Sequence, residues 1–176
     1  MKKDKMIEIR RANIEDAIHI ALLGRITYTE SHGEYIENKQ NLLDFNDKHY
    51  AVSNIKKELN DKNNLFWIAF SDELPIGFAK ICLNENPQNK EDSNYCKLQR
   101  LYILNDFISL RIGSQMQDII LQKCIDLKFK TVWLTAYYKN TKGIKFYKKY
   151  GFEQIGSIDF FVGETNYENL IFAKNL

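Results

Sequence analysis

The sequence predicts a mixed α/β (α+β) fold, in which a mixed sheet of about seven strands is flanked by about four helices. Two observations carry this prediction. The first is an apolar hairpin at 65–70 and 76–83, which indicates antiparallel pairing. The second is a strand–helix–strand crossover at 96–104, 113–127 and 131–136, which indicates a parallel pair within the same sheet.

The elements before the hairpin follow from local patterns. Segment 7–12 alternates apolar and polar side chains, as a half-buried strand does. Asn13 then provides an N-cap, and apolar residues recur at helical spacing from 14 to about 30. The stretch 31–64 is polar and helical only in patches, with one short helix expected at 54–60.

The elements after the crossover close the sheet. A helix is expected at 141–150, because its apolar residues are followed by Gly151, a typical C-terminal stop. Strands at 152–161 and 169–174 are expected to pair as a closing hairpin around the turn at 162–164. The predicted order is therefore β-α-α-β-β-β-α-β-α-β-β.

Length and composition limit the class of protein. The 176 residues are enough for one domain, 1–176, and 44% of them are hydrophobic. With 25 basic and 23 acidic residues the net charge is +2, so we expect neither nucleic acid nor membrane as a partner. No stretch approaches the roughly 18 apolar residues of a membrane span, and the N-terminus does not resemble a secretory signal. We therefore expect a soluble, cytoplasmic protein.

The cysteines and histidines point away from a metal site. Cys82, Cys96 and Cys124 are far apart and lie in apolar surroundings, so we expect buried thiols of a reducing compartment. The three histidines are scattered and form neither an HExxH nor a CxxC-containing motif; they are His19, His32 and His49. The sequence therefore predicts no metal site.

Three features coincide in a fixed order in the second half. Strand 101–104 is followed by a loop that ends in 112–114 at a helix start. Strand 132–134 is followed by Asn140, and the string FYKKYGF occupies 146–152. With these features the sequence resembles the GCN5-related N-acetyltransferase (GNAT) superfamily over nearly the whole chain. The C-terminal segment is most similar to the bacterial PaiA-type spermidine/spermine acetyltransferases.

This resemblance implies the GNAT fold, with the sheet splayed between its fourth and fifth strands, and acetyl-CoA bound in that splay. The cofactor-binding residues that it implies are Leu101, Tyr102, Ile103, Arg111, Ile112, Gly113, Ser114, Asn140 and Lys149. Physical chemistry supports a pyrophosphate site at residues 111–114, because a helix N-terminus presents unpaired N–H groups and a partial positive charge to an anion. Asn140 and Lys149 also have ordinary structural roles open to them, as an N-cap region residue and as part of a solvated helix face.

The phosphate loop departs from the family pattern. The family has Gln or Arg where this chain has Ile108, and Gly where it has Arg111, so that only Gly113 remains. Glycine matters here because the backbone must approach the phosphate oxygens without an intervening Cβ. Arg111 could contact a phosphate through its charge, block the cradle with its side chain, or simply be exposed at an ordinary helix start.

The resemblance also implies a general acid, Tyr147. Acyl transfer from a thioester to a primary amine expels a thiolate, and a nearby phenol can donate a proton to it. Tyr147 could alternatively be a helix aromatic that packs into the core beside Phe146. No general base is identified, since Lys97 and Gln99 replace the glutamates that the related branch has on its fourth strand.

Several alternatives stay open at this point. Glu91, Asp92 or Tyr95 could relay a proton through water. The resemblance implies an amine as the acetyl acceptor, and it alone implies a polyamine. The acidic residues Glu30, Glu34 and Glu37 either attract this cationic acceptor or form a solvated stretch. A second function is a catalytically degenerate CoA-binding or interaction module. The aromatic residues of the closing hairpin are a candidate homodimer surface; they are Phe160, Phe161, Tyr167 and Phe172.

Overall fold

The computed structural model describes residues 6–87 and 94–176. Its strands are β1 (Ile7–Arg11), β2 (Asn64–Ser71), β3 (Leu74–Leu83), β4 (Tyr95–Ile103), β5 (Thr131–Tyr137), β6 (Glu153–Ile158), β7 (Phe161–Val162), β8 (Thr165–Asn166) and β9 (Asn169–Asn175). Its α-helices are α1 (Ala17–His32), α2 (Lys39–His49), α3 (Val52–Asn60), α4 (Ile112–Asp126) and α5 (Thr141–Lys149). Short 3-10 helices precede α1 at Ile14–Asp16 and α4 at Asn105–Leu110.

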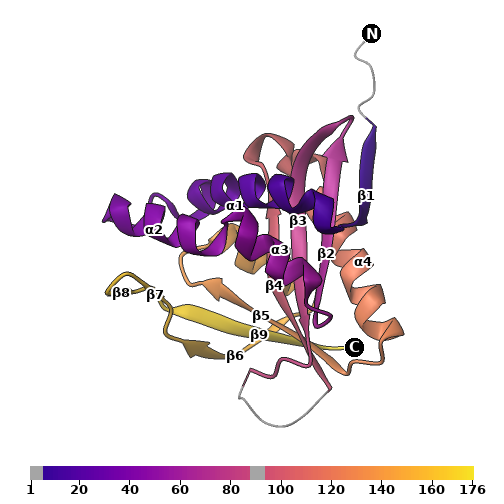
Figure 1. Ribbon diagram of the computed structural model, residues 1–176. Coiled ribbons are helices and arrows are strands. Elements are labelled where there is room, and N and C mark those ends of the chain that lie inside the picture. The colour runs from indigo at the N-terminus through magenta and orange to yellow at the C-terminus, as the bar shows by residue number, and fades with distance from the viewer. Residues whose placement is uncertain (1–5, 88–93) are drawn as a thin grey trace.

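The main sheet has seven strands in the order β1-β2-β3-β4-β5-β9-β6. The β4–β5 pair is parallel and the other neighbouring pairs are antiparallel, which confirms the predicted mixed sheet. Strands β4 and β5 pair only between Tyr95–Lys97 and Thr131–Trp133. Beyond these positions they separate, so that β5, β9 and β6 run obliquely to β1–β4 (Figure 1). The predicted splay between the fourth and fifth strands is therefore confirmed.

Helices cover both faces of the sheet. Helices α1 and α3 bury one cluster, which contains Ile20, Ile55 and Phe78, on one face. Helix α4 buries Met116 and Cys124 within the cluster on the other face. Strand β2 is buried on both sides, which explains why its sequence is continuously apolar rather than alternating. The three cysteines are buried and free, as predicted.

The described part of the chain contains five α-helices, where the sequence predicted about four. The additional one is α2, within the stretch expected to be helical only in patches. Asn38 caps it by accepting a hydrogen bond from the N–H of Gln40, and the buried residues of α2 are Leu42 and Asn46. Because so few of its positions are buried, the helical periodicity of α2 is weak in the sequence.

The closing hairpin is also more divided than predicted. Strand β6 ends at Ile158, and the turn region forms its own short hairpin, β7–β8. Of the aromatic residues expected at a homodimer surface, Phe172 is buried, and Phe160 and Tyr167 pack against the α1 cluster. Phe161 is 60% exposed, so dimerisation remains a prediction that rests on Phe161 alone.

Among the described residues, no helix is both long enough and apolar enough to cross a lipid bilayer.

Candidate functional site

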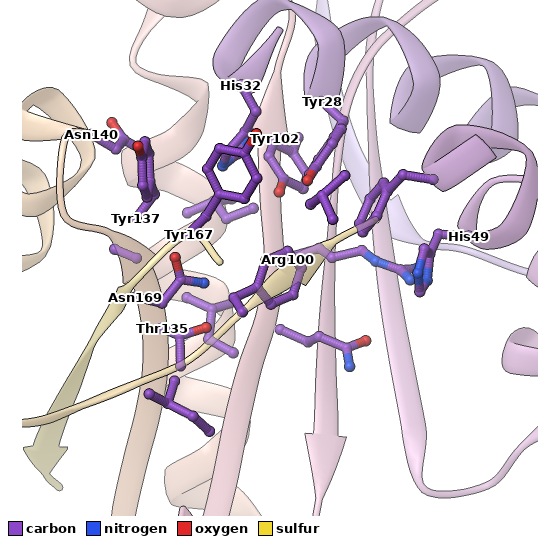
Figure 2. A pocket seen from close by; sticks show the side chains of 18 of the residues that line it. Tyr28, His32, His49, Arg100, Tyr102, Thr135, Tyr137, Asn140, Tyr167 and Asn169 are labelled. Atoms are coloured by element: carbon purple, nitrogen blue, oxygen red, sulfur yellow. The ribbon is translucent and has the colours of Figure 1, made fainter. Parts of the chain in front are cut away.

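A cavity of about 300 Å³ occupies the splay between β4 and β5. Since these strands share only three paired positions, side chains from both facing edges line the space beyond them. Helix α1 contributes Tyr28 and His32, which are one helical turn apart and therefore share a face. Figure 2 shows both side chains pointing from α1 toward the cavity, with Asn140 and Tyr137 on the opposite wall.

The cavity brings together four of the residues that the sequence singled out. Leu101 and Tyr102 line it from β4, Asn140 lies just after β5, and Tyr147 comes from α5. Ile103, which lies further along β4, is not among the lining residues; it faces the start of α4, where its Cγ1 is the nearest atom to a Cβ built on Gly113. Residues separated by more than forty positions in the sequence thus share one space.

Tyr147 combines a packed ring with a position on the cavity wall. Its ring lies edge-on to Phe152 at a centroid distance of 5.8 Å and to Phe146 at 5.3 Å. Tyr147 therefore packs against the core, as one of its two alternatives predicted, and it also lines the cavity, while its role as general acid stays a prediction. Burial raises the pKa of the Tyr147 phenol well above its ordinary value of 10, and nearby Tyr102 adds to the rise. The hydroxyl is therefore protonated, and able to donate, at neutral pH.

Asn140 has a defined structural role. Its Oδ1 accepts a hydrogen bond of 3.0 Å from the N–H of Gly143, which caps the N-terminus of α5. A Cβ at Gly143 would come within 3.0 Å of the Asn140 amide, so the glycine allows this close approach. Asn140 also lines the cavity. The N-cap role was one of the two alternatives in the sequence.

The start of α4 lies beyond Ile103. Arg111 is exposed and adopts a left-handed backbone conformation, with φ 57° and ψ 22°. Glycine adopts this conformation freely, whereas other residues pay about 1 kcal/mol for it. The geometry therefore gives a physical reason for a glycine at this position in the family pattern. Ile112 is fully buried and anchors the first turn of α4.

The space around the first turn of α4 suits an anion. Arg111 occupies the N-cap position of α4, and over the described residues its side chain makes no capping hydrogen bond. A Cβ at Gly113 would meet its nearest neighbour, Ile103 Cγ1, only at 4.0 Å, so the glycine is not required by internal packing. The hydroxyl of Tyr150 donates to the backbone oxygen of Ser114 and holds α5 against α4. The uncapped N–H groups and the open space over Gly113 fit a pyrophosphate.

Other predicted positions lie away from the cavity. Lys149 is exposed on α5 and does not line the cavity, so its phosphate contact stays a prediction. Tyr95 pairs with Thr131 at the closed end of the splay and is likewise not among the lining residues. Glu91 and Asp92 lie outside the described residues. Of the described candidates for a proton relay, Tyr95 therefore supplies no base in the cavity.

Lys97 and Gln99 do line the cavity, at the positions where the related branch has glutamates. The ammonium of Lys97 lies 2.6 Å from Glu85 Oε1 and 4.5 Å from the centre of the Trp133 ring. The carboxylate of Glu85 is thus neutralised by Lys97, and Glu85 itself is not a lining residue. This arrangement does not restore the missing carboxylate base.

His32 is a functional candidate that the sequence analysis missed. It lines the cavity, and its ring stacks on Tyr28 at 4.5 Å. Burial lowers its pKa from 6.5 to about 4, so the imidazole is neutral at pH 7. Ser31 Oγ lies 3.3 Å from the Tyr28 carbonyl and 2.6 Å from His32 Nδ1; the tautomer with the proton on Nδ1 and the lone pair on Nε2 is compatible with both contacts. No motif surrounds His32, so only the fold reveals it.

The acidic residues proposed to attract a cation lie elsewhere. Glu30, Glu34 and Glu37 are not among the lining residues, and Glu30 Oε2 accepts a hydrogen bond from the N–H of Asn105. Of the described residues that line the cavity, only Asp159 carries a carboxylate, and it is exposed. The walls are instead rich in tyrosine and phenylalanine rings, such as the stacked pair of Tyr28 and Phe45.

Comparison with known proteins gives a consistent result. The model of the acetyltransferase (GNAT) family matches residues 28–152. An uncharacterized N-acetyltransferase in the pepI 3′ region of Lactobacillus delbrueckii subsp. lactis is 18% identical over 172 residues, which cover 98% of this chain and 97% of that protein.

Solved structures share the fold. The PaiA N-acetyltransferase from Thermoplasma acidophilum, in complex with coenzyme A, superposes with a TM-score of 0.80 at 21% identity, covering 97% of this chain and 99% of that one. A GCN5-related N-acetyltransferase from Rhodopseudomonas palustris has a TM-score of 0.75 at 16% identity, with 96% and 95% coverage. At these identities the similarity concerns the fold.

Proposed function

The chain belongs to the acetyltransferase (GNAT) family, and on this basis we propose that it transfers an acetyl group from acetyl-CoA to a primary amine. The observation that carries the proposal is the cavity in the splay between β4 and β5. Tyr147 lines it from α5 and His32 lines it from α1, so a proton donor and a proton acceptor share one space. A simple binding module has no need of that combination.

The residues that would hold acetyl-CoA follow from the geometry. The edge of β4 at Leu101–Ile103 is not paired with β5, so its backbone groups are available to the pantetheine amides. The N–H groups from Arg111 to Ser114 would hold the pyrophosphate, and Asn140 would contact the arm. Acetyl-CoA supplies an activated acetyl thioester, whose thiolate is a good leaving group.

Tyr147 would act as the general acid. Its phenol keeps its proton at neutral pH because burial raises the pKa, and proton donation to the departing thiolate stabilises the leaving group as the carbon–sulfur bond breaks. The rigid ring contacts with Phe146 and Phe152 hold the hydroxyl in one place, so little entropy is lost in the transition state.

His32 would accept the proton that the amine loses. An alkyl ammonium of pKa about 10.4 must first become neutral, which costs about 4–5 kcal/mol at pH 7. Once the nitrogen bonds to the acetyl carbon it becomes cationic and far more acidic, and neutral Nε2 of His32 can then take its proton. A neutral, buried imidazole suits this role better than a charged one.

The narrower assignment concerns the branch and the acceptor. The resemblance to PaiA-type enzymes implies a polyamine, and the superposition with the Thermoplasma acidophilum PaiA supports a common fold with that branch. The acceptor class that we propose is a small primary amine.

Calorimetric titration with acetyl-CoA at physiological salt tests the proposal. We expect binding in the micromolar range, followed by release of CoA when a primary amine is added. No detectable binding up to millimolar acetyl-CoA would contradict the enzyme assignment. Binding of acetyl-CoA without transfer to any primary amine would instead favour the degenerate CoA-binding module, for which the departures at Ile108 and Arg111 are the supporting observation.

Replacing His32 with glutamine should lower kcat/KM by about 10²- to 10³-fold at pH 7, because the amide cannot accept the proton. The affinity for acetyl-CoA, measured by the same titration, should change little. A kcat/KM within threefold of the unmodified protein would remove His32 from the mechanism.

The same variant has a second expected effect, on stability. The pKa of His32 is about 4 in the folded state and about 6.5 in the unfolded state. Between these values the unfolded chain binds more protons, so the free energy of unfolding falls as the pH is lowered from 6.5 toward 4. The free energy of unfolding should be measured with urea at pH 7 and at pH 5. The difference between these two values should be smaller in His32→Gln than in the unmodified protein. Some difference should persist, because burial also lowers the pKa of His49.

A further inference from the structure

Two buried cations share one carboxylate beside the cavity. Lys80 of β3 and Arg100 of β4 are paired positions in the sheet, so their side chains lie on the same face. Glu58 of α3 reaches both of them: its Oε2 is 3.1 Å from Lys80 Nζ and 2.7 Å from Arg100 Nη1, and its Oε1 is 3.2 Å from Nη2. Lys80 is 4% exposed and Arg100 is 9% exposed.

The charges of this cluster do not cancel. Two cations and one carboxylate leave 2 − 1 = +1 in a buried site. Over the described parts of the chain, neither cation has an ion pair with another carboxylate. The aromatic rings of Tyr50, under Arg100, and Phe66, under Lys80, offset only part of this charge. A buried net charge is unfavourable unless an opposite charge reaches it, so an anion is expected nearby.

Arg100 presents the uncompensated charge to the cavity. Arg100 pairs with Lys80 and Leu98 pairs with Ile81, so Gln99 is an extra residue that forms a β-bulge in β4. Bulges redirect the neighbouring side chains, and Arg100 lines the cavity, where Figure 2 shows it near His49. A guanidinium has five N–H donors, and Glu58 engages two of them in the hydrogen bonds described. The remaining donors suit a second carboxylate.

The rest of the wall agrees with an anionic group. The exposed Asp159 is the one carboxylate among the described lining residues, so a purely cationic acceptor finds little compensation. His49 adds no positive charge, because burial and the charge of Arg100 both lower its pKa. The cavity of about 300 Å³ is small, and the rings of Tyr28 and Phe45 offer an apolar surface.

We propose that the acetyl acceptor is a small primary amine that also carries a carboxylate, as an amino acid does, and that Arg100 binds this carboxylate. The inference rests on the proposed acetyl transfer and narrows its acceptor. Arg100 is then a specificity-determining residue, and Lys80 is a positioning residue that supplies the excess charge through Glu58. A polyamine carries no such group.

Matched pairs of amines that differ only in the carboxylate test the inference. Suitable pairs are phenylalanine with 2-phenylethylamine and lysine with cadaverine, together with spermidine and the pair phosphoethanolamine and ethanolamine. We expect kcat/KM to be at least tenfold higher for the carboxylate member of each amino acid pair. The same pairs should be titrated into the CoA-saturated protein, so that discrimination is measured whether or not a compound is acetylated.

Two variants separate the role of Arg100 from a general loss of stability. Arg100→Gln should bring the ratio of kcat/KM within each pair close to one. Arg10→Gln is the matched control, because Arg10 also forms a two-bond ion pair, at 2.8 Å with each oxygen of Asp16, but lies outside the cavity. In Arg10→Gln the preference should persist. Lys80→Met should reduce the preference for the carboxylate member only in part, since the guanidinium of Arg100 remains.

Several results would overturn the inference. These are a wild-type preference for spermidine or for the decarboxylated amines, equal binding within each pair, or a preference that survives in Arg100→Gln. Higher activity with phosphoethanolamine than with any amino acid would replace the carboxylate by a phosphate and also reject the inference as stated. Failure of the proposed function looks different, because then either acetyl-CoA would not bind or no amine of either kind would be acetylated.

Discussion

Tyr147→Phe is expected to lower kcat by about 10²- to 10⁴-fold and to leave the KM for acetyl-CoA nearly unchanged. The substitution removes only a hydroxyl on the cavity wall. The ring contacts with Phe146 and Phe152 are retained, so the helix and the core beneath it should keep their packing. Initial rates at saturating amine, followed through CoA release, measure the effect.

The pH dependence of this variant is also informative. Because burial raises the pKa of the Tyr147 phenol, the unmodified protein should keep its general acid protonated throughout the range in which it is folded. The rise of rate with pH should therefore report the amine and not Tyr147, and Tyr147→Phe should lower the whole profile without moving its midpoint.

Tyr150→Phe is the matched control, since it removes a phenol from the residue that ends the same helix. The Tyr150 hydroxyl donates to Ser114 at the start of α4 and does not line the cavity. Any effect of Tyr150→Phe should appear in the KM for acetyl-CoA and not in kcat. A kcat for Tyr147→Phe within threefold of the unmodified protein, or an equal loss in both variants, would reject Tyr147 as the general acid.

Gly113→Glu is expected to weaken acetyl-CoA binding by about 100-fold or more without destabilising the protein. A Cβ at Gly113 meets only Ile103 Cγ1, at an ordinary contact distance of 4.0 Å, so a side chain can be added there without a clash. Glutamate in the first turn of α4 favours the helix through its propensity and its interaction with the dipole, each worth about 0.5–1 kcal/mol. The same carboxylate occupies and repels the position proposed for the pyrophosphate.

Two measurements decide this prediction. Thermal unfolding should show an unchanged or raised Tm, and calorimetry should show the loss of acetyl-CoA affinity. Gly113→Gln separates the effect of size from that of charge, since glutamine is nearly as large as glutamate but neutral. Its affinity for acetyl-CoA should lie between that of the unmodified protein and that of Gly113→Glu. Unaltered affinity in Gly113→Glu would place the pyrophosphate elsewhere.

Local patterns were sufficient where an element buries a clear face. The predicted strand at 131–136 and helix at 113–127 agree with β5 and α4 to within one residue at each end. Helix α2 escaped prediction because its two buried residues are too few to produce a clear helical period. Arg111 illustrates a different limit: its identity left open a phosphate contact, a blocked cradle or an exposed side chain, and only the structure shows that it is exposed and has a left-handed backbone.

The sequence by itself determined the order of the seven strands that form the main sheet, the mixed pairing of that sheet and the family resemblance, because apolar periodicity and the FYKKYGF string are properties of neighbouring residues. Only the tertiary structure decided the composition of the cavity. His32 has no motif around it, and Arg100 lies in an ordinary strand pattern; they meet because β4 and β5 separate after three paired positions. Arg100, Lys80 and Glu58 come from three different elements, β4, β3 and α3. Their ion pairs form only when α3 packs on the sheet and brings Glu58 within reach of both cations.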